Sequence, residues 1–273
     1  MPELPEVETY RRYIQAAAFD QTIDTMTCED PRKLLLNEES EMLEILRGSK
    51  FIGSKRVGKH LFIQLSKEKW WLYMHFGMTG DLLYFHEDEE PPRHARIVFY
   101  FTNGFRLGFI CPRKFERVGI TDNPTAFLAK KKVAEDALEI PFSTFFKNVH
   151  KRKMPIKSVL LDQSTIAGIG NWIADDVLHR AKIHPERLAA DLTEKEVKDI
   201  LKATQYIVNQ TIATEASYEH LPDDFLIHAR GWGKVGVKPK CPICGTDIVT
   251  IRVGGRATYF CSKCQAFPTA TSK

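Results

Sequence analysis

The stretch CPICGTDIVTIRVGGRATYFCSKC, residues 241–264, decides the fold of the C-terminal part of the chain. It contains two CxxC pairs, Cys241 with Cys244 and Cys261 with Cys264, separated by sixteen residues. Each pair can direct two thiolates at one ion, and two such pairs on facing turns form a tetrahedral four-thiolate zinc site. We therefore expect one structural Zn²⁺, because four protein ligands leave no open position for catalysis.

The segment between the cysteine pairs predicts a hairpin that the metal would brace. Gly254-Gly255 separates two runs of β-branched and aromatic residues, which is typical of a two-residue turn between strands. A zinc ion can supply the stability that a module this small lacks. Arg256 follows the turn, where a rigid guanidinium suits a phosphate contact, although a solvated surface arginine is an equal interpretation. Two unrelated redox CxxC pairs are the alternative for the cysteines.

The positive charge of the chain is concentrated around this cysteine-rich segment. The 273 residues carry a formal net charge of +4. Residues 228–273 include eight Lys or Arg residues and one acidic residue, a net charge of +7, so the rest of the chain carries −3. Concentrated basic charge favours a polyanionic partner such as nucleic acid, with a solubilising surface as the alternative.

The composition excludes several classes of protein. Hydrophobic residues make up 43% and charged residues 27%, which is ordinary for a globular chain and excludes a mainly disordered one. No apolar run approaches the ~20 residues of a membrane span. The N-terminus, MPELPEVETYRRYIQ, has acids before bases and no apolar core, so we do not expect a secretory signal. We expect a cytoplasmic protein whose paired cysteines bind metal.

Helical periodicity dominates the part of the chain before the cysteine module. Helices are predicted over 156–163, 171–181 and 193–212, and the last begins with a capping box formed by Thr193 and Glu196.

The sequence Ala-Gly-Ile-Gly-Asn at 167–171 lies between two of these helices. Its glycines allow a tight turn with exposed backbone N–H groups, and the next helix adds its positive dipole end, so the turn could seat a phosphate. An ordinary helix–helix turn is the alternative. The basic run at 150–153 and Lys157 favour the phosphate seat.

The first half of the chain predicts a sheet structure preceded by one helix. Residues 4–18 predict a helix that Pro and Glu open. Short β-branched and aromatic runs, separated by turn-forming or charged stretches, then predict an antiparallel sandwich or barrel. These runs are 61–65, 70–75, 81–85, 95–101 and 105–110.

Pro2 is a candidate nucleophile. Initiator methionine is normally removed before so small a residue, which would leave Pro2 with a free secondary amine. An α-amino group has a pKa of roughly 8, and a neutral secondary amine can attack an aldehyde or acetal carbon to form an iminium ion. Glu3 and Glu6 lie beside it as candidate acid/base groups. If Met1 stays, the nitrogen of Pro2 is an amide without nucleophilic character. A simple helix start is the alternative interpretation.

These motifs together resemble the bacterial formamidopyrimidine-DNA glycosylases. The resemblance begins at MPELPEVET, residues 1–9, and it covers nearly the whole chain in order. It continues through Gly58-Lys59, HFGMTG at 75–80, PRKF at 112–115, Lys157, Gly170-Asn171, HPER at 184–187 and GRAT at 255–258 in the cysteine module.

The resemblance implies an α+β multi-domain fold. The expected parts are an N-terminal helix plus antiparallel β-sandwich over 1–122, a linker over 123–140, a helix–two-turns–helix domain over 141–227, and a β-hairpin zinc finger over 228–273.

The resemblance also implies a base-excision-repair DNA glycosylase with AP lyase activity, acting as a monomer on damaged double-stranded DNA in the bacterial cytoplasm. The amine of Pro2 would attack C1′ of an oxidised nucleotide, with Glu3 as acid/base for opening of the sugar ring. A Schiff base would then lead to β- and δ-elimination. Lys59 would contact the phosphate next to the lesion.

Further residues are implied to bind the DNA. Asn171 and Arg256 would hold the phosphates of the bent strand, and Lys157 would add positive charge to the DNA-facing surface. Chemistry at C1′ requires the nucleotide to leave the stack. The gap must then be filled, which an apolar wedge with an arginine can do. Met78, Arg113 and Phe115 match that trio; without the resemblance, Met78 and Phe115 would be taken as core residues.

The chain departs from the family pattern at three places. The segment 213–227 is short and acidic and lacks the usual Gly/Thr-rich loop, so the preferred damaged base is not fixed. Cys111 and Glu116 stand where the family commonly has Asp and Gly. The aromatic residue after Asn171 is Trp172, one position earlier than in the family, so no tyrosine contact is expected there.

Three alternatives remain from the sequence. One is a Nei-like glycosylase whose substrates exclude 8-oxoguanine, and another is a catalytically silent protein that binds damaged DNA. The third, a zinc-ribbon module of a transcription or ribosome assembly, leaves the N-terminal motif unexplained.

Overall fold

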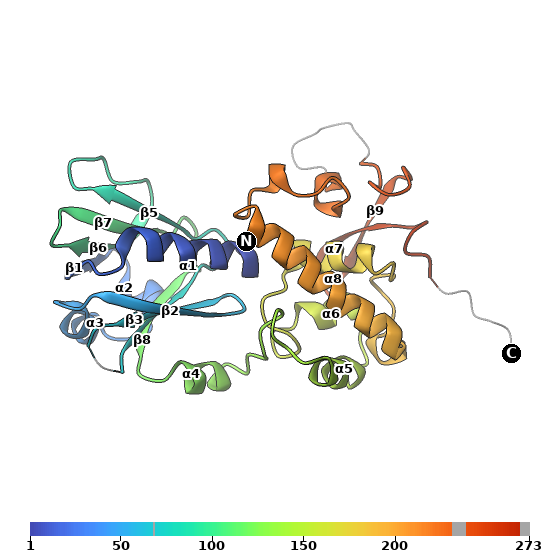
Figure 1. The fold of residues 1–273 in the computed structure, drawn as a ribbon, viewed down its shortest axis with the longest axis horizontal. Helices are drawn as coiled ribbons and strands as arrows, with labels where there is room; N and C mark the ends of the chain where they lie inside the picture. The colour runs from blue at the N-terminus through green and yellow to red at the C-terminus, as the bar shows by residue number, and fades with distance from the viewer. Residues whose placement is uncertain (68, 231–238, 268–273) are drawn as a thin grey trace, which may run out of the picture. The chain divides into compact units, whose positions relative to one another are not determined.

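The chain forms two compact units, Met1–Lys132 and Val133–Lys273 (Figure 1). The structure is a computed structural model, and it describes residues 1–67, 69–230 and 239–267. Three basic residues of the predicted C-terminal charge cluster, Lys234, Lys238 and Lys273, lie outside the described residues. Within the described ranges, no helix combines the length and the apolar character that crossing a membrane requires.

Unit 1 begins with helix α1, Leu4–Ala18, which packs against strands β2 (Phe51–Val57), β3 (His60–Leu65) and β5 (Asp81–His86). Eight strands follow in two antiparallel four-stranded sheets, with strand orders β1-β6-β7-β5 and β2-β3-β4-β8. The strands are β1 Ile23–Cys28, β2 Phe51–Val57, β3 His60–Leu65, β4 Trp71–His75, β5 Asp81–His86, β6 Ala95–Phe101, β7 Phe105–Ile110 and β8 Arg117–Thr121. Short helices α2, Pro31–Leu34, and α3, Glu39–Leu46, connect β1 to β2. The predicted helix and sandwich are confirmed.

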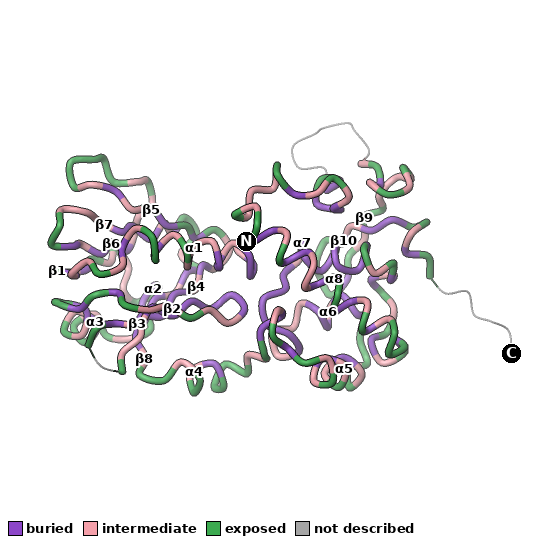
Figure 2. Tube along the Cα trace, in the orientation of Figure 1, coloured by how far each residue is buried: buried purple, intermediate pink, exposed green. Residues whose placement is uncertain are grey.

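The core of unit 1 is formed by buried residues of both sheets and of α1, and Figure 2 colours the buried parts of the chain purple. Strand β3 is buried on both faces and so lacks the alternation of a half-exposed strand. One face points into the core, and on the other Phe62 packs edge-to-face on Phe127, which also contacts Tyr73. Phe127 belongs to helix α4, Pro124–Lys130. This helix lies inside the region predicted as a linker, and its Asn123 cap accepts a hydrogen bond from the Ala126 N–H.

Unit 2 contains helices α5, Phe142–His150; α6, Ile156–Leu161; α7, Asn171–Arg180; and α8, Glu194–Ala213. Helix α8 begins with the predicted capping box, in which the Thr193 N–H donates to Glu196 Oε2 at 2.8 Å. Short 3-10 turns lie at Ala189–Asp191, Tyr218–His220 and Leu226–Ala229. Residues 133–140, the rest of the predicted linker, belong to this unit because Ala134 and Ala137 donate to backbone carbonyls of the α6–α7 turn.

The cysteine module ends unit 2 as a two-stranded antiparallel hairpin. Strand β9, Ile248–Val253, pairs in continuous register with β10, Arg256–Cys261. Gly254 and Gly255 form the turn with φ of +56° and +76°, the left-handed conformation that a two-residue hairpin turn requires. The hairpin packs on α7, so the helical part and the hairpin form one unit. The predicted fold class, including the hairpin, is confirmed.

Candidate functional site

Pro2 and Glu3 lie at the positive end of helix α1. Glu3 occupies the N-cap, and its side chain is reciprocally bonded with Glu6 in a capping box, in which the Glu3 N–H donates to Glu6 Oε2 at 2.9 Å. Only 2% of Glu3 is exposed. The backbone of the first helical turn is therefore fixed directly after Pro2, and a carboxyl group is held in a desolvated position beside it.

Lys59 lies in the turn between β2 and β3, which is tied to the same helix. Arg56 donates to Glu8 Oε2 of α1 at 3.1 Å and to the carbonyl of Gly58 at 3.1 Å. Lys59 is 9% exposed, so its aliphatic stem is packed. Glu8 thus links the helix that follows Pro2 to the turn that carries Lys59, across 48 residues of sequence.

Glu8 is held as a carboxylate by its arginines. Burial alone would raise the pKa of Glu8, but hydrogen bonds and charge from Arg11 and Arg56 outweigh burial and lower this pKa from 4.5 to about 2. A carboxylate whose folded-state pKa is depressed stabilises the fold above its unfolded pKa, and this contribution is lost as the pH falls through the folded value.

We expect Glu8→Gln to destabilise unit 1 at neutral pH by roughly 2 kcal/mol, because the amide leaves the arginines without their counterion. The difference between the variant and the unchanged protein should shrink as the pH falls from 4.5 toward 2. Urea unfolding at a series of pH values measures it. Glu41→Gln, at an exposed position, is the control and should show no such trend. An equal pH dependence in both variants would contradict the linkage.

Two histidines beside the turn that carries Lys59 are uncharged at neutral pH. Burial, together with nearby charges that include Lys59, lowers the pKa of His60 to about 3 and that of His75 to about 4. The Gly77 N–H donates to His75 Nδ1 at 3.2 Å, which leaves the ring proton of His75 on Nε2. His75 therefore presents a neutral N–H donor immediately before the turn that carries Met78.

The predicted wedge residues lie on two neighbouring turns of unit 1. Met78 is half-buried in the turn after β4, while Arg113 and Phe115 are exposed in the turn before β8. Lys114 between them adopts the left-handed conformation, with φ of +56°, and its ammonium pairs with Asp30 at 2.9 Å. The Arg113 guanidinium lies over the Phe115 ring at 5.1 Å. Because half of the Phe115 surface is exposed, Phe115 is not a core residue.

In unit 2, the turn between α6 and α7 is braced from inside by Gln163. Its side chain accepts from the Gly168 N–H at 2.9 Å and donates to the Ile169 carbonyl at 2.9 Å. Asn171 then begins α7, and its amide donates to the Ala257 carbonyl of the hairpin at 3.0 Å. Trp172 is buried and packs edge-to-face on Tyr218, so it belongs to the core.

Lys157 lies in a buried charge cluster and not on a DNA-facing surface. It is fully buried, and its ammonium contacts Asp175 Oδ1 at 2.7 Å, Thr258 Oγ1 at 2.8 Å and the Ala257 carbonyl at 3.0 Å. All three N–H bonds are thus used within unit 2. The carboxylate of α7 and the hairpin therefore hold the Lys157 ammonium inside unit 2, whereas the resemblance implied a place for it on the DNA-facing surface.

Asp175 is the centre of that cluster. Its second oxygen accepts from Arg230 at 2.9 Å and from the Tyr259 N–H of β10 at 3.2 Å. Lys157 and Asn171 both donate to the carbonyl of Ala257, the residue after Arg256. The backbone that carries the exposed Arg256 side chain is therefore fixed to α6 and α7 through polar contacts.

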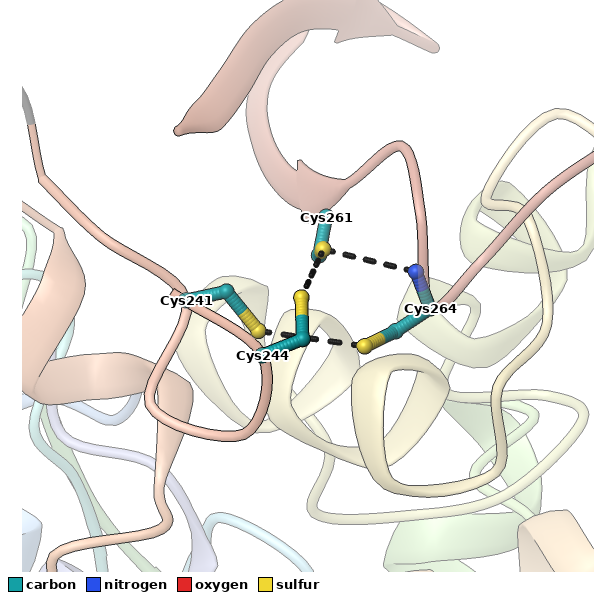
Figure 3. Close-up of side chains that lie close together, drawn as sticks. All are labelled: Cys241, Cys244, Cys261 and Cys264. Carbon is teal, nitrogen blue, oxygen red and sulfur yellow. Dashed lines mark hydrogen bonds between the residues drawn. The ribbon is translucent and has the colours of Figure 1, made fainter. Parts of the chain in front are cut away.

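The four predicted zinc ligands converge (Figure 3). Their sulfur atoms all lie within 4.8 Å of one another, with Cys244 to Cys261 at 3.5 Å and Cys241 to Cys264 at 3.9 Å. Tetrahedral Zn–S bonds of about 2.3 Å place two sulfurs about 3.8 Å apart. The residues present therefore fit one structural zinc, as predicted. His179, a residue of helix α7, places its Nε2 3.2 Å from the Cys241 sulfur.

Sequence reasoning missed the supporting groups Glu8, Arg56 and Asp175. Arg11 and Arg12 follow Glu8 by three and four residues, which signals ion pairs on one helix face but not the distant Arg56. Asp175 and its neighbour Asp176 lie between the apolar runs 172–174 and 177–178 of helix α7, which is the available sign of a buried acidic group.

Family models match three parts of the chain in order. The formamidopyrimidine-DNA glycosylase N-terminal domain matches residues 1–118, the formamidopyrimidine-DNA glycosylase H2TH domain matches 133–221, and the zinc finger found in FPG and IleRS matches 238–266.

Curated relatives and solved structures agree with these matches. The formamidopyrimidine-DNA glycosylase of Pelotomaculum thermopropionicum is 37% identical over 281 residues, covering 97% of this chain and 99% of that protein. The Lactococcus lactis enzyme, solved non-covalently bound to DNA containing an AP site, is 29% identical with a TM-score of 0.87. A MutM complex with DNA containing carbocyclic 8-oxo-G is 30% identical with a TM-score of 0.87. Each solved structure covers 97% of this chain and is itself covered completely.

Proposed function

The chain belongs to the formamidopyrimidine-DNA glycosylase family, and we propose that Pro2 is the nucleophile with which it removes oxidised bases from double-stranded DNA. Members of this family are base-excision-repair DNA glycosylases with AP lyase activity, and so is this protein. The observation that carries the assignment of the nucleophile is the start of α1. There, Pro2 precedes the buried carboxyl of Glu3, and Glu8 ties the same helix to the turn of Lys59.

The first step forms a bond between the Pro2 nitrogen and C1′ of the damaged nucleotide. The bond from C1′ to the base breaks, and the base leaves with the electron pair. The nitrogen of Pro2 loses its N–H proton as it bonds to C1′, and the departing base takes up a proton from it directly or through water. Glu3 donates a proton to the sugar-ring oxygen, the ring opens, and the nitrogen lone pair completes an iminium ion with C1′. A secondary amine gives an iminium that stays positively charged without added protonation.

That iminium drives strand cleavage. It acidifies the C2′ hydrogen, whose loss expels the 3′ phosphate, and a second elimination expels the 5′ phosphate. Water then releases the enzyme from the sugar fragment. Lys59 contributes a positive charge for the phosphate next to the lesion, and its turn is held by Arg56 and Glu8.

Phosphate contacts from unit 2 hold the DNA while the nucleotide is extruded. We assign this role to Asn171 at the start of α7 and to Arg256 at the tip of the hairpin. Unstacking one nucleotide costs a few kcal/mol, and contacts of this kind offset it. Met78, Arg113 and Phe115 fill the vacated position in the stack.

We expect Arg256→Ala to weaken binding to all DNA sequences similarly and to reduce the salt slope of log K by about one, because one phosphate contact is lost. Fluorescence anisotropy at several salt concentrations measures both quantities. Arg252→Ala, an exposed arginine on the other strand of the hairpin, is the matched control and should leave the slope unchanged. An unchanged slope in the Arg256 variant would count against a phosphate contact.

Borohydride trapping tests the proposed chemistry. With DNA that contains an abasic site, the enzyme should give a covalent protein–DNA adduct on reduction, whereas a silent binder would shift the DNA without an adduct. Similarity to proteins solved with Fapy-dG and 8-oxo-G DNA supports oxidised purines as substrates. Cleavage rates on DNA that contains 8-oxoguanine, formamidopyrimidine, hydantoin or an oxidised pyrimidine rank these damaged bases as substrates. Efficient cleavage of the oxidised pyrimidine alone would favour the Nei-like alternative.

We propose further that the protein acts as a monomer in the bacterial cytoplasm. The relatives named above come from bacteria, and their substrate is DNA. Light scattering of the protein with and without DNA measures the stoichiometry, and a stable dimer on one lesion would contradict it.

A further inference from the structure

Glu116 is a buried carboxyl that the chemistry above does not use. It directly follows Phe115, and none of its surface is exposed. Its Oε1 accepts a hydrogen bond from the Thr79 hydroxyl at 3.3 Å, and within the described ranges its Oε2 has no hydrogen-bond partner. Burying a carboxyl with so little compensation is costly, so an apolar side chain would stabilise this position better if packing were its only role.

The Thr79 contact joins the two turns that carry the wedge residues. Thr79 follows Met78 in one turn, and Glu116 follows Phe115 in the other. No other side-chain hydrogen bond between these two turns is found in the part of the chain that the structure describes.

The backbones of the two turns also touch, so a shift of one would displace the other. A Cβ on Gly77 would lie 2.7 Å from the carbonyl carbon of Phe115, and a Cβ on Gly80 would lie 2.9 Å from Cγ of Glu116. Gly77 has φ of +54° and therefore also needs the left-handed conformation. The Tyr10 hydroxyl donates to the Gly80 carbonyl at 3.3 Å and anchors this pair of turns to α1.

We propose that Glu116 is a positioning residue that fixes the turn of Arg113 and Phe115 against the turn of Met78, and thereby sets the preference for the base opposite the lesion. The proposal rests on the proposed function, in which these side chains enter the gap in the stack. In this role Arg113 contacts the base opposite the lesion. Its N–H donors distinguish a base edge rich in hydrogen-bond acceptors from an edge with donors only if the guanidinium is held in a fixed position. If the two turns are less firmly held together, the guanidinium of Arg113 can occupy a wider range of positions, while C1′ and Pro2 stay in place.

The test is AP lyase cleavage of DNA with one abasic site opposite C, G, A or T. We expect Glu116→Ala and Thr79→Val to reduce the spread of kcat/KM across the four opposite bases by about threefold to tenfold, with cleavage opposite the best base nearly unchanged. Thr79 is exposed, so Thr79→Val keeps the core intact and serves if the Glu116→Ala variant folds poorly. Glu116→Gln retains an acceptor oxygen and should preserve the spread.

Lys114→Ala is the matched control, because it breaks the link of the same turn to Asp30 without touching Thr79. The proposal would be overturned by an unchanged spread of kcat/KM in both Glu116→Ala and Thr79→Val, or by a parallel fall in kcat/KM for all four opposite bases. It would also be overturned if the protein without substitutions showed no opposite-base preference. Absence of any borohydride adduct with the unchanged protein would instead overturn the proposed chemistry. The two failures are therefore distinguishable.

Discussion

Changing Pro2 to glutamine is expected to lower the rate of adduct formation and strand cleavage at an abasic site by at least about a thousandfold, because removal of a nucleophile costs orders of magnitude. A residue of that size also blocks removal of Met1, so the nitrogen at position 2 becomes an amide. Single-turnover cleavage of abasic-site DNA, with intact mass to verify the N-terminus, measures the effect.

Pro5→Ala is the control for this change. It also replaces a proline in the first turn of α1 but leaves the N-terminal amine intact, so cleavage should stay within a few-fold of the unchanged protein. The Pro2→Gln variant should still bind the DNA, because its phosphate contacts are untouched. Cleavage at a normal rate with a retained Met1 would show that another amine performs the attack.

Loss of zinc is expected to have the second large effect. Cys261→Ser should lower the affinity for abasic-site DNA by about a hundredfold or more, because zinc supplies most of the folding free energy of such a module. Without the folded hairpin, Arg256 loses its place and the carbonyl of Ala257 no longer receives Lys157 and Asn171. Anisotropy gives the affinity, and metal analysis gives the zinc content.

Hydrogen exchange separates this local effect from general unfolding. Amides of strands β3 and β4 in unit 1 should keep their protection in Cys261→Ser, while those of β9 and β10 should lose it. Cys28→Ser, at a cysteine outside the metal site, is the control and should keep both zinc and affinity. Full affinity in a protein that has lost its zinc would refute a structural role of the metal in DNA binding.

Local signals in the sequence were sufficient for the metal site and for several elements. The cysteine spacing and Gly254-Gly255 determine the hairpin because ligands and turn lie within one short segment. Thr193 and Glu196 mark the start of α8 through contacts three residues apart. Asn123 marks the start of α4 in the same way, yet the low periodicity around it concealed this helix within a predicted linker.

The supporting network could not be predicted, because its partners are far apart in sequence. In the sequence, Lys157 looks like a surface cation. The fold shows that Asp175 and the hairpin, whose Ala257 lies 100 residues further along the chain, enclose its ammonium. Glu8 likewise shows its role only through Arg56. The sequence shows which side chains are charged, whereas the fold determines which of them are exposed to solvent and which hold other residues in place.

The most direct test of the central claim is to locate the reduced cross-link within the protein. After borohydride trapping on abasic-site DNA and proteolysis, mass spectrometry should find the sugar remnant on the nitrogen of Pro2, in a peptide that lacks Met1. A remnant on Lys59 or on any other lysine, with Pro2 unmodified, would contradict the account.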